Sequence, residues 1–182
     1  TVAGATFVWS ATTSNINMLA VSGDETNIDQ VVNLINTFQN GTINIEVKPK
    51  IGTCFGASQQ ILVTVKPIPV ITSTVSNETV ICDNEYVTLI SSSNPAATLY
   101  NWQINTATGV QIVGGATSGT SATGIVNLQL ALTNPLVAGS ISFNFTPVNG
   151  ICTGATIFNA VTILVNPIPG TPILLPDDEI CS

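Results

Sequence analysis

The segment Gly41-Thr-Ile-Asn-Ile-Glu-Val-Lys-Pro49 decides the fold of this chain, because it occurs twice. Its second copy is Gly139-Ser-Ile-Ser-Phe-Asn-Phe-Thr-Pro147, which begins 98 residues further along. In both copies, apolar side chains alternate with polar ones, a pattern typical of a β-strand with one buried and one solvated face. We therefore expect the same strand at the same place in two repeated units.

The surrounding residues repeat with nearly the same period. The repeated features are Trp9 and Trp102, Val32–Leu34 and Val126–Leu128, the Gly-x-Cys-x-Gly motif at 52–56 and 150–154, and Pro-Ile-Pro at 67–69 and 167–169. A period of roughly 100 residues is the size of one independently folding β-sandwich and is too long for a solenoid repeat. The chain therefore contains a piece of a tandem array.

The repeat boundaries divide the chain unevenly. We predict a sandwich without its N-terminal segment at residues 1–69, a complete sandwich at 70–169, and the start of a third repeat at 170–182. Proline fixes φ and favours extended backbone, so the two Pro-Ile-Pro junctions predict short, semi-rigid linkers. Neighbouring units should then form a stiff rod.

Alternating apolar residues predict an all-β chain. Further strands are expected around Phe7 and Trp9, at 61–65, 86–90, 100–104, 126–132 and 161–165. Residues 27–38 have apolar residues at helical spacing, but we interpret them as a strand because repeated units should share a fold. The small, polar stretch 116–124 is predicted to be a loop.

The composition excludes several classes of partner. Only 7% of the 182 residues are charged, and there is no Arg and no His. The three basic residues, Lys48, Lys50 and Lys66, all lie in the first unit, so we expect neither nucleic acid nor an anionic membrane surface as a partner. No run approaches 18 consecutive apolar residues, and we therefore expect no membrane insertion.

The sequence lacks the residues of common catalytic sites. Without His there is no Ser-His-Asp or Cys-His arrangement and no His-based metal site. A Ser-Lys nucleophile would need a Lys in each unit, and the second unit has none. We therefore predict no catalytic residues, no cofactor-binding residues and no enzymatic activity.

Two acidic clusters are candidate calcium ligands. Asp83 and Glu85 follow Cys82, and Asp177, Asp178 and Glu179 precede Cys181. Carboxylates from a linker and a neighbouring domain can hold Ca²⁺ and stiffen a rod. The two clusters do not superpose under the repeat, however, which favours solvated surface charge over a metal site.

The four cysteines occupy two repeated positions. Cys54 stands in the place of Cys152, and Cys181 stands in the place of Cys82. The repeat thus predicts a disulfide between Cys82 and Cys152 within the second unit, with the partners of the other two beyond the ends of this sequence. Four reduced, buried thiols are the alternative. A bridge would imply an oxidising, extracytoplasmic compartment.

Several phrases of the second unit support a comparison with a known family. They are Thr79-Val-Ile-Cys82, Tyr100-Asn-Trp102, Ser142-Phe-Asn-Phe-Thr-Pro147, Gly150-Ile-Cys-Thr-Gly154 and Val161-Thr-Ile-Leu-Val-Asn-Pro-Ile-Pro169. In this order and spacing they resemble the PKD-like (polycystic-kidney-disease-like) repeats of giant bacterial surface proteins exported by type IX secretion. The resemblance implies immunoglobulin-like sandwiches, an extracellular location on the cell surface or in a secreted appendage, and a structural or adhesive role. No catalytic residue carries over from it.

These observations favour a structural or adhesive segment of a giant extracellular repeat protein, forming a stalk, filament or surface appendage. The expected partners are copies of the chain itself or adjacent repeats, with a glycan or cell-surface ligand also open. The alternative is a carbohydrate-binding or spacer module of a secreted hydrolase. The first unit lacks about 25 residues that the second has before its Trp strand, and we expect neighbouring sequence, in cis or in trans, to complete it.

Overall fold

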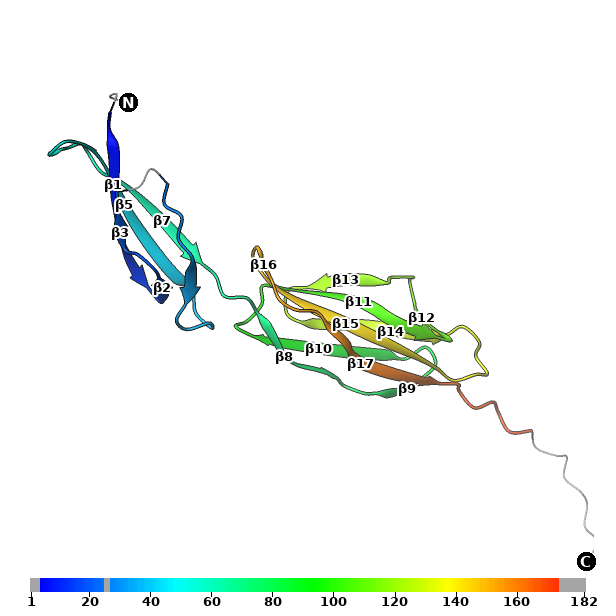
Figure 1. Cartoon of the computed structure of the whole chain (residues 1–182). Helices are drawn as coiled ribbons and strands as arrows, with labels where there is room; N and C mark the ends of the chain where they lie inside the picture. Colours follow the sequence, from blue (N-terminus) through cyan, green and yellow to red (C-terminus); the bar gives the residue numbers. More distant parts are fainter. Residues whose placement is uncertain (1–3, 25–26, 174–182) are drawn as a thin grey trace, which may run out of the picture.

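The chain is built from β-strands. The computed structural model describes residues 4–24 and 27–173, and in this part of the chain there are 17 strands and no helix. No helix among the described residues is therefore long and apolar enough to cross a membrane. The strands form two immunoglobulin-like units that lie end to end (Figure 1). The predicted fold class is confirmed.

The second unit is a two-sheet sandwich. Its strands are β8 (Val70–Ser76), β9 (Val80–Cys82), β10 (Tyr86–Asn94), β11 (Leu99–Thr108), β12 (Val110–Ile112), β13 (Ser118–Ser121), β14 (Ile125–Leu132), β15 (Gly139–Asn149), β16 (Cys152–Thr153) and β17 (Ile157–Asn166). One sheet has the order β12-β14-β10-β8, and the other has the order β13-β11-β15-β17-β9, with β16 also paired to β15. The pairing of β17 with β9 is parallel.

The core of this unit fills the space between the two sheets. The alternation in β15 places Ile141, Phe143 and Phe145 on the inner face, where each is fully buried. The rings of Phe143 and Trp102 meet edge to face, with ring centroids 6.1 Å apart. From the opposite sheet, Val87, Leu89 and Leu130 complete the contact. Fully burying an aliphatic side chain of this size contributes about 1.5–3 kcal/mol.

The first unit repeats part of this arrangement. Its strands are β1 (Thr6–Ser14), β2 (Ile16–Met18), β3 (Ser22–Gly23), β4 (Val32–Leu34), β5 (Gly41–Ile51), β6 (Cys54–Phe55) and β7 (Gln59–Val65). The order β3-β1-β5 with β7 beside β5 matches β13-β11-β15 with β17 beside β15. The second sheet consists of β2 and β4 alone among the described residues.

The two tryptophans occupy equivalent buried positions, as predicted. Trp9 pairs with Val47 and is 3% exposed, while Trp102 pairs with Phe145 and is 7% exposed. Each indole covers a glycine of the next strand, Gly23 or Gly119, where an added Cβ would lie within 3 Å of the indole nitrogen. The close approach explains why glycine stands at both positions.

Three details differ from the sequence-based expectations. Val32–Leu34 pairs with β2, and residues 130–132 pair in the same way with β12, the counterpart of β2 in the second unit. The repeat in the sequence matched Val32–Leu34 with Val126–Leu128 instead, and that match is wrong by four residues. Only residues 32–34 of the expected strand at 27–38 form one. The stretch 116–124 is not a simple loop, because β13 within it pairs with β11.

The first unit leaves one sheet face partly uncovered. None of its described residues forms a counterpart of β8, β9 or β10. Ile61 and Val63 of β7 are consequently 50% and 38% exposed, whereas their counterparts Val161 and Ile163 are 7% and 0% exposed. The same strand pair is thus buried in one unit and open in the other.

Replacing Phe143 with Ala should lower the free energy of unfolding of the second unit by about 3–5 kcal/mol, because a large cavity would open between the sheets. Its counterpart in the first unit is the half-buried Ile45, and Ile45→Ala should cost about 1 kcal/mol there, since less surface leaves water on folding. Urea unfolding followed by circular dichroism measures both. Equal losses in the two variants would contradict the difference in packing.

Candidate functional site

The junction between the two units is a built contact. Pro67 and Pro69 are buried where the linker passes the end of the second unit. The carbonyl oxygen of Lys66 accepts a hydrogen bond from the Cys152 thiol, with 3.7 Å between oxygen and sulfur. A Cβ added to Gly154 would lie 2.0 Å from the Pro69 carbonyl oxygen, so only glycine admits this approach of the two backbones.

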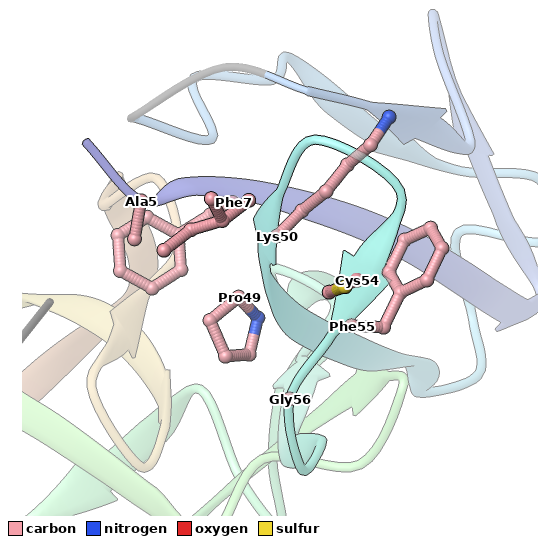
Figure 2. A pocket seen from close by; sticks show the side chains of 8 residues that line it. Ala5, Phe7, Pro49, Lys50, Cys54, Phe55 and Gly56 are labelled. Atoms are coloured by element: carbon pink, nitrogen blue, oxygen red, sulfur yellow. The ribbon is translucent and has the colours of Figure 1, made fainter.

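The far end of the first unit carries an apolar hollow of about 520 Å³. Figure 2 shows Phe7 and Pro49 toward one side of it and Cys54 and Phe55 toward the other. The ammonium group of Lys50 lies 5.6 Å from the centre of the Phe55 ring. The full lining is Ala5, Phe7, Pro49, Lys50, Ile51, Cys54, Phe55 and Gly56.

The hollow occupies the same place on the first unit that the linker contact occupies on the second. Phe7 pairs with Pro49 as Tyr100 pairs with Pro147. Ile51 pairs with Cys54 as Asn149 pairs with Cys152. The turn closes identically, since the amide of Gly56 donates to the carbonyl of Pro49 at 2.9 Å and that of Gly154 to Pro147 at 2.8 Å. We call this place the linker seat of each unit.

The two linker seats differ in what covers them. In the second unit, Pro147 is fully buried beside Gly154, which meets the linker at Pro69, and Tyr100 is 5% exposed because it lies against β10, with its hydroxyl 3.0 Å from that of Ser93. In the first unit, their counterparts Pro49 and Phe7 are only half-buried. The lining of the hollow is apolar apart from the Lys50 ammonium and the Cys54 thiol, and it contains no carboxylate for acid–base chemistry.

The predicted disulfide between Cys82 and Cys152 is wrong, because both thiols are free. Cys82 pairs with Asn166 at the last residue of β17, whereas Cys152 lies beside Lys66 at the opposite end of the unit. β17 has 10 residues, and a strand of that length spans roughly 30 Å. A disulfide requires Cα atoms within about 7 Å, so the two cysteines of one unit cannot meet. Cys181 lies outside the described residues.

The acidic residues near Cys82 are engaged in backbone hydrogen bonds. Asp83 Oδ1 accepts from the amide of Leu132 at 2.7 Å, and Glu85 Oε2 accepts from the amide of Cys82 at 2.8 Å. No three potential ligands gather at one point among the described residues. Asp177, Asp178 and Glu179 lie outside those residues, so calcium binding by this set stays a hypothesis.

Other polar and aromatic groups form no further site in the described part of the chain. The Lys48 ammonium, 3.0 Å from the Glu46 carboxylate, holds the pKa of that exposed carboxyl below its usual value. Tyr86 and Phe158, two exposed aromatic residues of the second unit, belong to different sheets. They therefore form no shared platform of the kind that would favour the carbohydrate-binding alternative.

Comparison with known proteins places the fold only distantly. No protein-family model and no curated protein sequence matches the chain. Solved structures that it resembles include domains 4 and 5 of the S-layer protein SbsC, at 15% identity over 88% of this chain and 70% of that chain, with a TM-score of 0.34. The amphioxus IgVJ-C2 molecule is 14% identical over 86% and 89%, with a TM-score of 0.36. The D00-D0 domain of Intimin is 12% identical over 82% and 83%, with a TM-score of 0.32.

Sequence reasoning found the repeated Gly-x-Cys-x-Gly motif but missed the linker seat that it builds. The available signal was a Pro at position 49 or 147 followed by the last Gly of the motif. The Pro and this Gly lie side by side because β5 and β15 are each followed by a short strand that pairs back on them. Only the structure shows that the first Pro-Ile-Pro segment lies against the second of these turns.

Replacing Gly154 with Ala should lower the free energy of unfolding of the second unit by about 1–3 kcal/mol, because the new methyl group would overlap the Pro69 carbonyl and force the linker outward. The urea midpoint of the second unit measures the loss. Gly170→Ala is the matched control, since no atom lies within 4 Å of a Cβ added there. Indistinguishable midpoints for the two variants would refute the contact.

Proposed function

We propose that this chain is a structural segment of an extracellular repeat protein, in which immunoglobulin-like units join end to end as a stalk, filament or surface appendage. The observation that carries the proposal is the junction at residues 66–69. There the linker is seated against the next unit instead of passing freely through solvent. A seated linker restricts rotation between units, which is what a long appendage needs to remain extended.

The partly uncovered face of the first unit supports self-association. Ile61 and Val63 of β7 are 50% and 38% exposed and Ile45 of β5 is half-buried, and these side chains point toward the side that the second sheet covers in the other unit. Apolar surface of this kind is costly to leave in water, and strand addition is a common way to cover it. The proposed partner is a strand segment of the β8–β10 type from an adjacent repeat or a second copy.

The charge pattern and the resemblance in sequence refine the proposal. The second unit has no basic residue, and the chain's formal net charge is −7, which disfavours nucleic acid as a partner. The resemblance to PKD-like repeats suggests a bacterial cell surface and export by type IX secretion, with adhesion as one role. On this proposal the chain has no enzymatic activity and no cofactor.

Replacing Ile61 with Asp should abolish concentration-dependent association of the reduced chain, because the incoming strand would bury an unpaired carboxylate. Sedimentation velocity over a range of concentrations measures the effect. Leu62→Asp adds the same charge to the neighbouring residue of β7, on the opposite face and 69% exposed, and should leave association intact. A wild-type chain that stays monomeric at every concentration would count against self-association.

The extracellular location has its own test. Antibodies against the folded chain should label the surface of intact cells that produce it, and external protease should remove that label. Labelling that requires permeabilised cells would refute this part of the proposal.

A further inference from the structure

The internal junction serves as a template for how any two such units meet. In the second unit, the linker seat holds the carbonyl of Lys66 beside Cys152 and the carbonyl of Pro69 against Gly154. These linker residues have direct counterparts 100 positions later. In the first unit Gly41 of β5 pairs with Val65 of β7, and in the second unit Gly139 of β15 pairs with Val165 of β17, so Val65 and Val165 are equivalent. Asn166 therefore corresponds to Lys66, and Pro169 to Pro69.

The linker seat of the first unit offers the same receiving surface at the other end of the pair of units. Gly56 and Gly52 correspond to Gly154 and Gly150. A Cβ on Gly150 would meet the Lys66 ammonium at 2.9 Å, while a Cβ on Gly52 would meet no described atom within 4 Å. The seat and its complementary segment, Pro167-Ile-Pro169, thus lie at opposite ends of the pair of units, and a second copy can bring them together.

We propose that the hollow at 5–7 and 49–56 binds the Pro167-Ile-Pro169 segment of a second copy, head to tail, and that Cys54 then forms a disulfide with Cys82 of that copy. The proposal rests on the end-to-end array argued above and adds a covalent bond at each junction. It reassigns the cysteines from a bond within one unit to a bond between successive units.

The positions of the two sulfurs follow from the template. At the internal junction, the Cys152 sulfur lies 3.7 Å from the carbonyl oxygen of Lys66. In the docked arrangement, the Cys54 sulfur takes the same position beside the carbonyl of Asn166 of the second copy. The carbonyl of Asn166 accepts a hydrogen bond from the amide of Asp83 at 2.9 Å, and Cys82 directly precedes Asp83 and pairs with Asn166. The Cys54 and Cys82 side chains therefore both lie next to Asn166 in the docked arrangement.

Both cysteines are accessible for this reaction. Cys54 and Cys82 are each exposed and free in the single chain. Neighbouring strands lie about 4.8 Å apart, a separation within the range of Cα distances that a disulfide bridges. The same geometry at the internal junction would join Cys152 to a cysteine that stands beside Lys66 in a completed first unit.

The bond requires an external oxidant. Two thiols lose two protons and two electrons as the S–S bond forms, and a small-molecule disulfide such as oxidised glutathione accepts them and is released as two thiols. In an extracellular setting, disulfides of this class form and persist. A filament joined this way would resist separation of its units until reduced.

The test uses the full chain with Cys152→Ser and Cys181→Ser, which leaves Cys54 and Cys82 as the only thiols. Incubation with oxidised glutathione should produce a ladder of multimers on non-reducing gels, and mass spectrometry should identify a peptide pair that joins Cys54 to Cys82. Adding Cys54→Ser or Cys82→Ser should abolish the ladder. A mixture of those two variants should stop at the dimer, because only one junction can form.

A charged residue introduced into the linker distinguishes disulfide formation after docking from disulfide formation by random collision. Pro169→Lys should slow multimer formation about tenfold or more, because the seat is apolar and the only charged group in its lining is the Lys50 ammonium, which repels a second ammonium. Thr162→Lys, at an exposed position on β17, adds the same charge away from the seat and should leave the rate unchanged.

Three results would overturn the disulfide proposal. These are a Cys54–Cys82 bond within one chain, a multimer ladder insensitive to Pro169→Lys, and no Cys54–Cys82 peptide after complete oxidation. If the reduced chain still associates in sedimentation while that peptide is absent, the disulfide proposal is refuted and the proposed end-to-end array is not. If the reduced chain does not associate at all, the proposed array is refuted as well.

Discussion

The structure depends on one constraint: an amphipathic sheet must have its apolar face covered. In the second unit, β15 and β17 are covered by β14, β10 and their neighbours, and residues such as Phe143 and Ile163 are fully buried. In the first unit, the same strand pair has only β2 and β4 opposite it among the described residues. The exposed Ile61 and Val63 are the direct result, and they make association with further strands favourable.

The junction follows from a second, more local constraint. Gly154 allows the linker backbone to approach closely enough for Pro69 to be buried. The hollow on the first unit repeats, at Pro49 and the turn at Gly56, the surface that receives this linker, and it also contains Phe7, whose counterpart Tyr100 is covered by β10. The linker seat is thus occupied by the linker in the second unit and is an open hollow in the first unit. This difference is the basis of the proposed head-to-tail arrangement.

Much of the fold could be predicted from periodicity. The alternation in β5 and β15, the two buried tryptophans and the all-β class were recognisable because side-chain direction in a strand has a period of two. The alignment of Val32–Leu34 and the loop at 116–124 were wrong, because short strands at a sheet edge carry too few apolar residues to define a register. Of the five carboxylates in the calcium hypothesis, Asp83 and Glu85 accept backbone hydrogen bonds, and the other three lie outside the described residues.

The sequence by itself determined the repeat, its period and the strands that build each unit, because these depend on residue types at regular local spacing. Only the tertiary structure decided which cysteines can meet. The repeat showed that Cys82 and Cys152 belong to the same unit. It did not show that they lie at opposite ends of β17, one whole strand length apart. The linker seat was likewise invisible, because it joins residues from strands far apart in the chain, and such proximity arises only when the sheet folds.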